Sequence, residues 1–130
     1  MKLSLDAQSP LHLIRSYSAD DVRVGEGTFR RSCIVTPENV IADWRPASVE
    51  ELTEADLEPL FAAQPQIVLL GTGAVQRFPH VNIRGAFAKR GVALETMDLG
   101  AACRTFNILV QEERRACAAL LFGGSRRDSL

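Results

Sequence analysis

The chain has 130 residues, of which 46% are hydrophobic, so it can form one compact domain that buries roughly two thirds of its unfolded surface. Its 15 basic and 16 acidic side chains give a net charge of −1, which excludes the strongly basic class of nucleic-acid-binding proteins. The charge is uneven: residues 1–65 carry 6 basic and 11 acidic side chains, a net of −5, and residues 66–130 carry 9 and 5, a net of +4. We therefore expect the two halves to attract each other weakly.

The first third of the chain predicts an antiparallel β-meander. Residues 10–17 partly alternate between polar and apolar and are rich in β-forming residues, which indicates a first strand or extended arm. The runs 22–24 and 28–35 flank a glycine-rich turn and predict a hairpin. A second turn, at 36–39, leads into a further expected strand at 40–44.

From residue 48 onward the pattern predicts alternating helices and strands. Capping-type signals at Ser48 and Thr53 precede apolar residues at helical spacing, so we expect a helix over about 53–61. The run at 66–70 is apolar at four consecutive positions, which is typical of a strand covered on both faces. A further helix is expected after Pro79, with its end at Arg90 and with Gly91 as the C-terminal cap. Another helix is expected over 101–113, and further strands over 92–97 and 116–122.

This order of elements predicts the α/β class, with a mixed sheet, helices packed on it and an N-terminal antiparallel β-meander, because strands joined through helices pair in parallel. The sequence has no repeats and no low-complexity linker. We therefore expect a single domain over 1–130, with an ordered core at about 10–123 and a loose polar tail at 124–130.

Polar residues follow two of the expected parallel strands, and ligands bind at such carboxyl ends. The Gly-Thr-Gly turn at 71–73 could cradle a phosphate or carboxylate with help from an arginine, or it could be a tight turn that packs strand against helix. It lacks the third glycine of the dinucleotide fingerprint, and no Gly-Lys-Ser/Thr follows. The candidate ligand-binding residues are Gly71, Thr72, Gly73, Arg77, Arg84, Asp98 and Thr105.

Three residues in this region allow both a chemical and a structural interpretation. His80 could be a general base or an ordinary helix-start residue, and no partnered nucleophile is visible. Cys103, near an expected helix N-terminus, could have a lowered thiol pKa and act in redox sensing, or it could be a core residue. Asp98 could pair with an arginine or cap the helix that follows. None of them indicates an enzyme, so we expect no catalytic residues.

Large apolar side chains could form a patch that binds a partner protein, with core packing as the alternative. These side chains are Phe78, Met97, Phe106 and especially Trp44, which stands at the end of an expected strand.

The cysteines Cys33, Cys103 and Cys117 are far apart, without a Cys-x-x-Cys pair, so neither a zinc site nor a disulfide framework is expected. An odd cysteine count and no signal peptide fit a reducing cytoplasm. No apolar run approaches the roughly 20 residues that cross a bilayer. We expect a cytoplasmic protein with no membrane span, no metal and no cofactor.

An ordered series of short motifs resembles the MTH-type domain family, which includes the mitochondrial complex I assembly factor three and the adipogenesis-associated MTH-domain protein. The motifs lie at 27–29, 32–35, 69–73, 91–92, 95–98 and 103–109, and the resemblance covers about 10–123. It implies a three-layer α/β fold and a non-catalytic accessory or assembly-type protein that acts through protein contacts. Without a transit peptide we expect no organelle role. The alternative is a small-anion binder or an unrecognised enzyme that uses the cleft beside the 71–73 turn.

Overall fold

The computed structural model describes residues 12–123, and their strands form two sheets. The strands are β1 (Ile14–Tyr17), β2 (Val22–Val24), β3 (Gly27–Phe29), β4 (Cys33–Val35), β5 (Val40–Ile41), β6 (Ile67–Thr72), β7 (Ala93–Met97) and β8 (Ala116–Leu121). A small antiparallel sheet has the order β1-β2-β3. The central sheet has the order β5-β4-β8-β6-β7, and β6 pairs in parallel with both β7 and β8, whereas β4 pairs antiparallel with β5 and β8.

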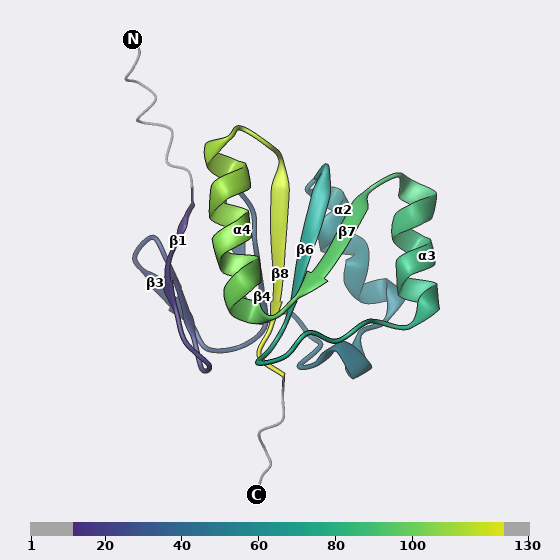
Figure 1. Cartoon of the computed structure of the whole chain (residues 1–130), viewed down its shortest axis with the longest axis horizontal. Coiled ribbons are helices and arrows are strands. Elements are labelled where there is room, and N and C mark those ends of the chain that lie inside the picture. Colours follow the sequence, from purple (N-terminus) through teal and green to yellow (C-terminus); the bar gives the residue numbers. More distant parts are fainter. Residues whose placement is uncertain (1–11, 124–130) are drawn as a thin grey trace, which may run out of the picture.

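Helices cover both faces of the central sheet. They are the short 3-10 helices η1 (Val49–Glu51) and η2 (Glu54–Leu57), followed by α2 (Glu58–Ala62), α3 (Val81–Arg90) and α4 (Leu99–Gln111). In Figure 1, α4 lies in front of the central sheet with the small sheet beside it, and α2 lies behind. The expected α/β class, with its central mixed sheet and N-terminal antiparallel meander, is confirmed.

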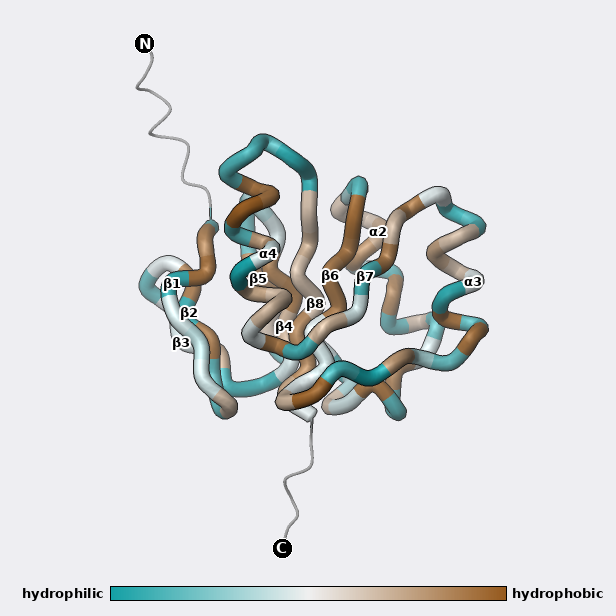
Figure 2. Tube along the Cα trace, in the orientation of Figure 1, coloured by the Kyte–Doolittle hydropathy of each residue, from teal (hydrophilic) through white to brown (hydrophobic). Residues whose placement is uncertain are grey.

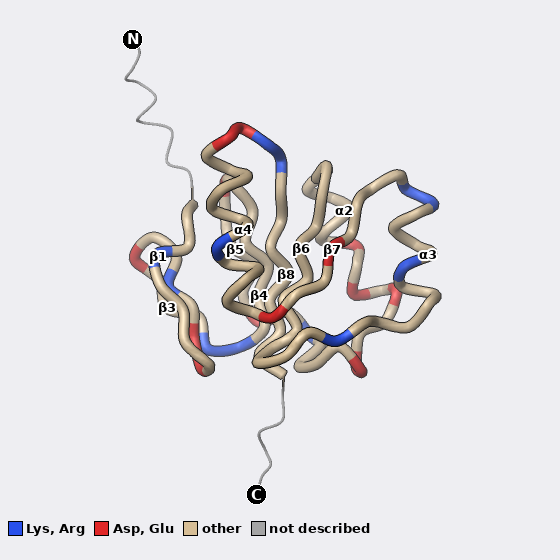
Figure 3. The backbone as a smooth tube through the Cα atoms, viewed as in Figure 1, with Lys and Arg blue, Asp and Glu red and all other residues tan. Residues whose placement is uncertain are grey.

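Strand β6 contributes to two hydrophobic cores because its side chains alternate between the faces of the sheet. Leu69 packs in the core under α4 and the small sheet, whereas Val68 and Leu70 pack in the core under α2 and α3. The strand and its neighbour β8 run through the middle of the molecule, and along both strands Figure 2 shows mainly hydrophobic colours and Figure 3 shows no charged residue. The prediction of a strand covered on both faces is confirmed.

The meander differs from the prediction in how its strands are assigned to sheets. The expected strand over 28–35 is divided: β3 pairs with β2, but β4 belongs to the central sheet and pairs with β8. The strand expected at 40–44 is shorter, and the backbone amide of Trp44 instead donates to the carbonyl oxygen of Ser32 at 2.8 Å. Alternation along the sequence predicts a strand but does not say which sheet it joins.

The predicted helix caps at Thr53 and Gly91 are present in the structure, whereas the one predicted at Ser48 is not. Thr53 and Asp56 form a capping box at the start of η2, but Ser48 makes no side-chain cap bond before η1. The helix expected over 53–61 is therefore a 3-10 turn that continues as α2. Gly91 ends α3 in the left-handed conformation, with φ of 69°, as predicted.

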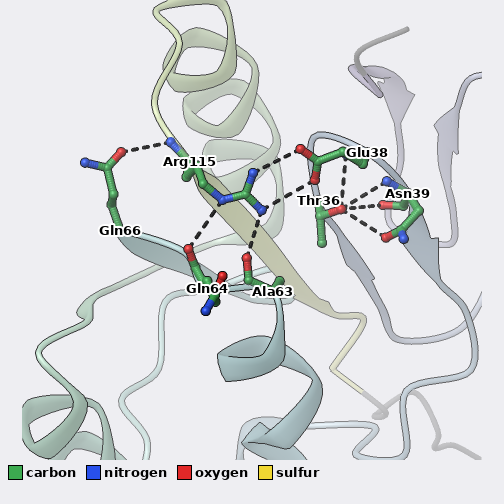
Figure 4. Close-up of polar contacts among 7 residues, drawn as sticks. All are labelled: Thr36, Glu38, Asn39, Ala63, Gln64, Gln66 and Arg115. Carbon is green, nitrogen blue, oxygen red and sulfur yellow. Dashed lines mark hydrogen bonds and ion pairs between the residues drawn. The ribbon is translucent and has the colours of Figure 1, made fainter. Parts of the chain in front are cut away.

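At the end of the sheet where β6 and β8 begin, Arg115 joins three segments (Figure 4). Its guanidinium donates to the carboxylate of Glu38 at 3.0 Å and to the carbonyl oxygen of Ala63 at 2.8 Å. Its backbone amide donates to the side-chain carbonyl oxygen of Gln66 at 2.9 Å. The β4–β5 turn, the end of α2 and the start of β6 are thus held to β8.

Candidate functional site

A cavity of about 450 Å³ opens where β6 and β8 end, at the opposite end of the sheet from Arg115. Four segments line it: residues 17–20 at the β1–β2 turn, residues of the loop after β6, residues 98–100 at the start of α4, and residues 122–123 after β8. This is the place beyond parallel strands where a cleft was expected. Of the candidate residues, Thr72, Gly73, Arg77 and Asp98 line the cavity, whereas Gly71, Arg84 and Thr105 do not.

The Thr72 hydroxyl fixes the conformation of the loop after β6. It donates to the carbonyl oxygen of Val75 at 2.6 Å and accepts from the backbone amide of Arg77 at 2.9 Å. The backbone amide of Leu99 donates to the carbonyl oxygen of Gly73 at 2.8 Å. The loop is therefore closed on itself and tied to the start of α4, which gives one wall of the cavity a defined shape.

Two glycines allow close backbone packing at this wall. A Cβ at Gly71 would lie 3.1 Å from the Ala102 Cβ and 3.2 Å from the Leu99 Cα, so the glycine lets β6 approach α4. Gly73 has φ of 93°, and a Cβ there would lie 3.2 Å from the Gly123 Cα. This geometry agrees with the interpretation of 71–73 as a turn that packs strand against helix, and it places Gly71 within the strand rather than at the cavity.

The arginines expected to hold an anion are directed elsewhere. The guanidinium of Arg77 donates to the carboxylate of Glu50 at 3.0 Å, and Arg84 is exposed on α3. The cavity walls also carry two acidic residues, Asp20 and Asp98. The charges around the cavity therefore do not favour an anion.

Asp98 has the capping role that was one of its two interpretations. Its Oδ1 accepts from the backbone amide of Ala101 at 2.9 Å, and α4 therefore begins at Leu99, two residues before the predicted start. His80 occupies the N-cap position of α3, where its exposed side chain makes no cap bond.

Cys103 lies on the inner face of α4, where it is buried. Burial raises the pKa of its thiol to about 12, and the neighbouring Cys33 contributes to the rise. A redox residue needs a lowered thiol pKa and access to solvent, so this environment opposes the reactive interpretation.

Residues of the small sheet and of the segment after β8 also line the cavity. The sequence did not predict that these residues contribute to it. The ring of Tyr17 packs on the start of α4, since a Cβ at Gly100 would lie 2.9 Å from its Cε1. Arg104 donates a hydrogen bond to the Tyr17 hydroxyl. Phe122 lies on the wall after β8. No local motif identifies these residues, because their position depends on docking of the small sheet against α4.

The connection from β6 to α3, together with the first residue of α3, exposes three large apolar side chains. Val75 is 54% exposed, Phe78 65% and Val81 83%. Figure 2 shows brown stretches interrupted by teal along this connection. We call these three residues the apolar loop surface.

The other residues expected at a partner-binding patch pack inside the protein. Phe106 is fully buried on the inner face of α4. Trp44 is buried in the other core, where its Nε1 donates to the carbonyl oxygen of Asp56 at 2.9 Å. Met97 is partly buried. Of the four expected residues, Phe78 alone belongs to an exposed surface. Because Trp44 is buried, core packing explains this residue.

Residues 12–123 offer neither a cluster of metal ligands nor a membrane-spanning helix. That part of the chain holds no group of three His, Cys, Asp or Glu side chains placed to bind a metal ion. None of its helices combines the length and the apolar character that crossing a membrane requires.

Comparison with protein families gives a match over residues 14–121 to the family described as "Protein of unknown function (DUF498/DUF598)". A Danio rerio protein named NADH dehydrogenase [ubiquinone] 1 alpha subcomplex assembly factor 3 is 34% identical over 84% of this chain and 63% of its own length. A Francisella tularensis protein named 13 kDa major membrane protein is 32% identical over 56% of this chain and 59% of its own length. The chain thus spans less than two thirds of these relatives.

Solved structures share the fold. An NMR structure of a Xanthomonas campestris protein has a TM-score of 0.82 at 31% identity and covers 99% of this chain and 98% of that one. A Bordetella pertussis protein, described as a Mth938-like domain, has a TM-score of 0.78 at 27% identity over 96% and 94% of the two chains. The resemblance to the MTH-type family is therefore confirmed.

Proposed function

Since the chain belongs to the DUF498/DUF598 protein family, we propose that it is a non-catalytic accessory protein of the assembly type, which acts in the cytoplasm by binding another protein. The similarity to proteins named as assembly factors of NADH dehydrogenase supports this role. By that analogy the partner is a component of a membrane-associated complex. The Francisella relative, which is named a membrane protein, is compatible with action close to a membrane.

The single observation that carries the proposal is the apolar loop surface. Val75, Phe78 and Val81 lie in one short segment and are all more than half exposed. Neighbouring exposed apolar side chains frequently mark a protein interface, and aromatic residues such as Phe78 supply much of the binding energy at such sites. The loop is held by the Thr72 hydroxyl and by the bond between Leu99 and Gly73. A preordered loop loses less conformational entropy on binding.

The proposal can be tested with a photo-crosslinking amino acid placed at Phe78 or, as a control, at Ile108, which is also exposed but lies on α4. In cells that express the full chain, we expect one discrete crosslinked protein from position 78 and none of the same mass from position 108. The double substitution Val75→Ser and Val81→Ser should remove most of the crosslink, since it takes away apolar contact area without touching the core.

Comparison of positions 78 and 108 shows whether the apolar loop surface binds a specific partner protein. Equal crosslinks from positions 78 and 108 would indicate nonspecific contact, and no crosslink from 78 would leave the apolar loop surface without a partner. Either result would contradict the proposal. A crosslink that persists in the Val75→Ser, Val81→Ser variant would also contradict it, because the contact would then not depend on the exposed apolar groups.

A further inference from the structure

We propose that the cavity at the ends of β6 and β8 binds a small organic cation with a flat apolar body, of the aryl amidine or aryl amine class. This site is separate from the protein contact proposed for the apolar loop surface, although Val75 borders both. The cavity volume of about 450 Å³ is within the range of about 300–1,000 Å³ that is usual for small-molecule sites.

The charged groups of the lining favour a cation. Asp20 and Asp98 contribute two carboxylates, and the one basic residue of the lining, Arg77, is paired with Glu50 at 3.0 Å. Asp98 uses Oδ1 to cap α4. Within residues 12–123, no hydrogen bond or ion pair engages its Oδ2 or the carboxylate of Asp20.

The N-terminus of α4 does not reverse this preference. A helix N-terminus carries about half a positive charge, and Asp98 places a full negative charge at that point. Three further arginines, Arg30, Arg31 and Arg45, do not line this cavity but line a neighbouring hollow that shares Asp20 and Phe122 with it. Arg45 is paired with Asp56 at 2.7 Å, and Arg31 lies 3.9 Å from Asp43. Arg104, whose guanidinium donates to the Tyr17 hydroxyl, lies beside the lining and offsets part of the negative charge. Within the lining itself, the charges without an ion-pair partner among residues 12–123 are the two carboxylates, so the lining favours a positive group.

The walls also provide apolar surface for the body of the ligand. Tyr17, Leu99 and Phe122 contribute an aromatic ring, an aliphatic side chain and a second aromatic ring. Tyr17 is positioned by its contact with Gly100 and by the hydrogen bond from Arg104. Aromatic faces attract flat apolar groups and cations, so an aryl cation matches both features of the lining.

Three probes of similar shape distinguish the effect of charge on binding from the effect of apolar contact. Benzamidine is a cation, benzamide is neutral and benzoate is an anion. We expect benzamidine to shift the backbone amide NMR signals of residues 17–20, 72–75 and 98–100 of the full ¹⁵N-labelled chain in a saturable manner. Benzamide should shift the same signals more weakly, and benzoate and inorganic phosphate should leave them unchanged.

Substitution of each acid tests which groups supply the charge. Asp20→Asn and Asp98→Asn should each weaken benzamidine binding about two- to fivefold, the range of partly exposed ion pairs, without changing benzamide binding. Asn is also a good N-cap residue, so Asp98→Asn preserves α4, and Asp20→Asn alters no cap. Glu112→Gln, at the other end of α4, is the matched control and should have no effect.

The proposal is overturned if benzoate or phosphate shifts these signals as strongly as benzamidine, because the site would then prefer an anion. It is also overturned if benzamidine shifts none of them, or if both acid substitutions leave its affinity unchanged. None of these outcomes bears on the crosslink from position 78, so the two proposals fail independently.

Discussion

Among single residues, Asp56 is a carboxylate whose pKa the fold lowers well below its usual value. Hydrogen bonds from Arg45 at 2.7 and 2.8 Å, with help from the backbone amide and hydroxyl of Thr53, lower its pKa from 3.8 to about 2, against burial, which raises it. Because the folded pKa is below the unfolded value, the carboxylate stabilises the fold above about pH 4. That stabilisation is lost as the pH falls from about 4 to about 2.

We therefore predict that Asp56→Asn lowers the free energy of unfolding at pH 7 by about 1–2 kcal/mol, a value reduced for solvent screening of the half-exposed Arg45. Urea denaturation at a series of pH values measures this. The difference between the two proteins should shrink as the pH falls towards 2. The control Asp43→Asn removes an exposed ion pair of 3.9 Å with Arg31 and should have almost no effect. A loss that stays constant down to pH 2 would show that charge is not the cause.

Arg115 provides a second residue-scale prediction. Its guanidinium reaches Glu38 and the carbonyl oxygens of Ala63 and Gln64, so Arg115→Ala leaves these groups without their donor. We expect the free energy of unfolding to fall by about 0.5–1.5 kcal/mol, because most of these groups are exposed and water can replace the donor. Arg114→Ala, next to it and exposed, should change it by less than about 0.5 kcal/mol. Equal losses from the two substitutions, measured by urea denaturation, would contradict a specific role for Arg115.

The residue scale also shows what the sequence can predict. Thr53 with Asp56 was predicted as a cap, and capping was one of the two interpretations of Asp98, because each of these caps joins residues only three apart. The contact of Arg115 with Glu38 joins residues 77 apart. From the sequence alone, Arg115 would be placed in the solvent-exposed segment at the end of the preceding helix. Local chemistry was therefore predictable at these two caps, although Ser48, also predicted from local sequence, makes no cap bond. Contacts made by the assembled fold were not predictable.

At the scale of elements, the turn after β6 depends on glycine. Gly73 has φ of 93° and lies against the backbone of Gly123, so Gly73→Ala introduces both backbone strain and a clash. We predict a loss of about 1–3 kcal/mol in the free energy of unfolding. Gly85→Ala is the matched control, because Gly85 lies within α3 and a Cβ there would meet no neighbouring atom within 4 Å; it should add about 0.5–1 kcal/mol. Thermal unfolding of both variants shows whether each substitution raises or lowers the free energy of unfolding. If Gly73→Ala stabilised the protein, an alanine would fit at position 73 without strain.

The elements themselves differ in how well the sequence predicts them. β6 was predicted because burial on both faces requires an apolar residue at every position, and α3 because Gly91 and the cations before it mark its end. The division between β3 and β4 was not predicted, because pairing with β8 is decided by residues far along the chain. For the same reason, the sequence did not predict that Tyr17 and Phe122 line the cavity: they border it only after the small sheet has docked.

For the molecule as a whole, the two oppositely charged halves of the sequence are joined by ion pairs. Arg77 pairs with Glu50 and Arg115 with Glu38, each at 3.0 Å. Both pairs agree with the expected attraction between the halves. They are exposed, so each contributes only about 0–1 kcal/mol, and the stability of the molecule depends mainly on the two cores on either side of the central sheet.

Those cores contain the three cysteines, which makes thiol alkylation a measure of whole-molecule unfolding. Burial raises the pKa to about 12 for Cys33 and Cys103 and to about 11 for Cys117. Because alkylation requires an accessible thiolate, we predict that iodoacetamide at pH 8 modifies all three only through global unfolding, so that the three rates share one dependence on urea. The logarithm of each rate should rise linearly with urea, with the slope of the full unfolding transition.

Mass spectrometry of peptides after a short pulse of iodoacetamide measures the three rates separately. A common dependence on urea would mean that both cores open together, since Cys33 and Cys103 belong to one core and Cys117 to the other. If Cys103 alone reacted at a rate independent of urea, α4 would open without unfolding of the sheet. The thiol would then be accessible in the folded protein, and the redox interpretation would regain its physical basis.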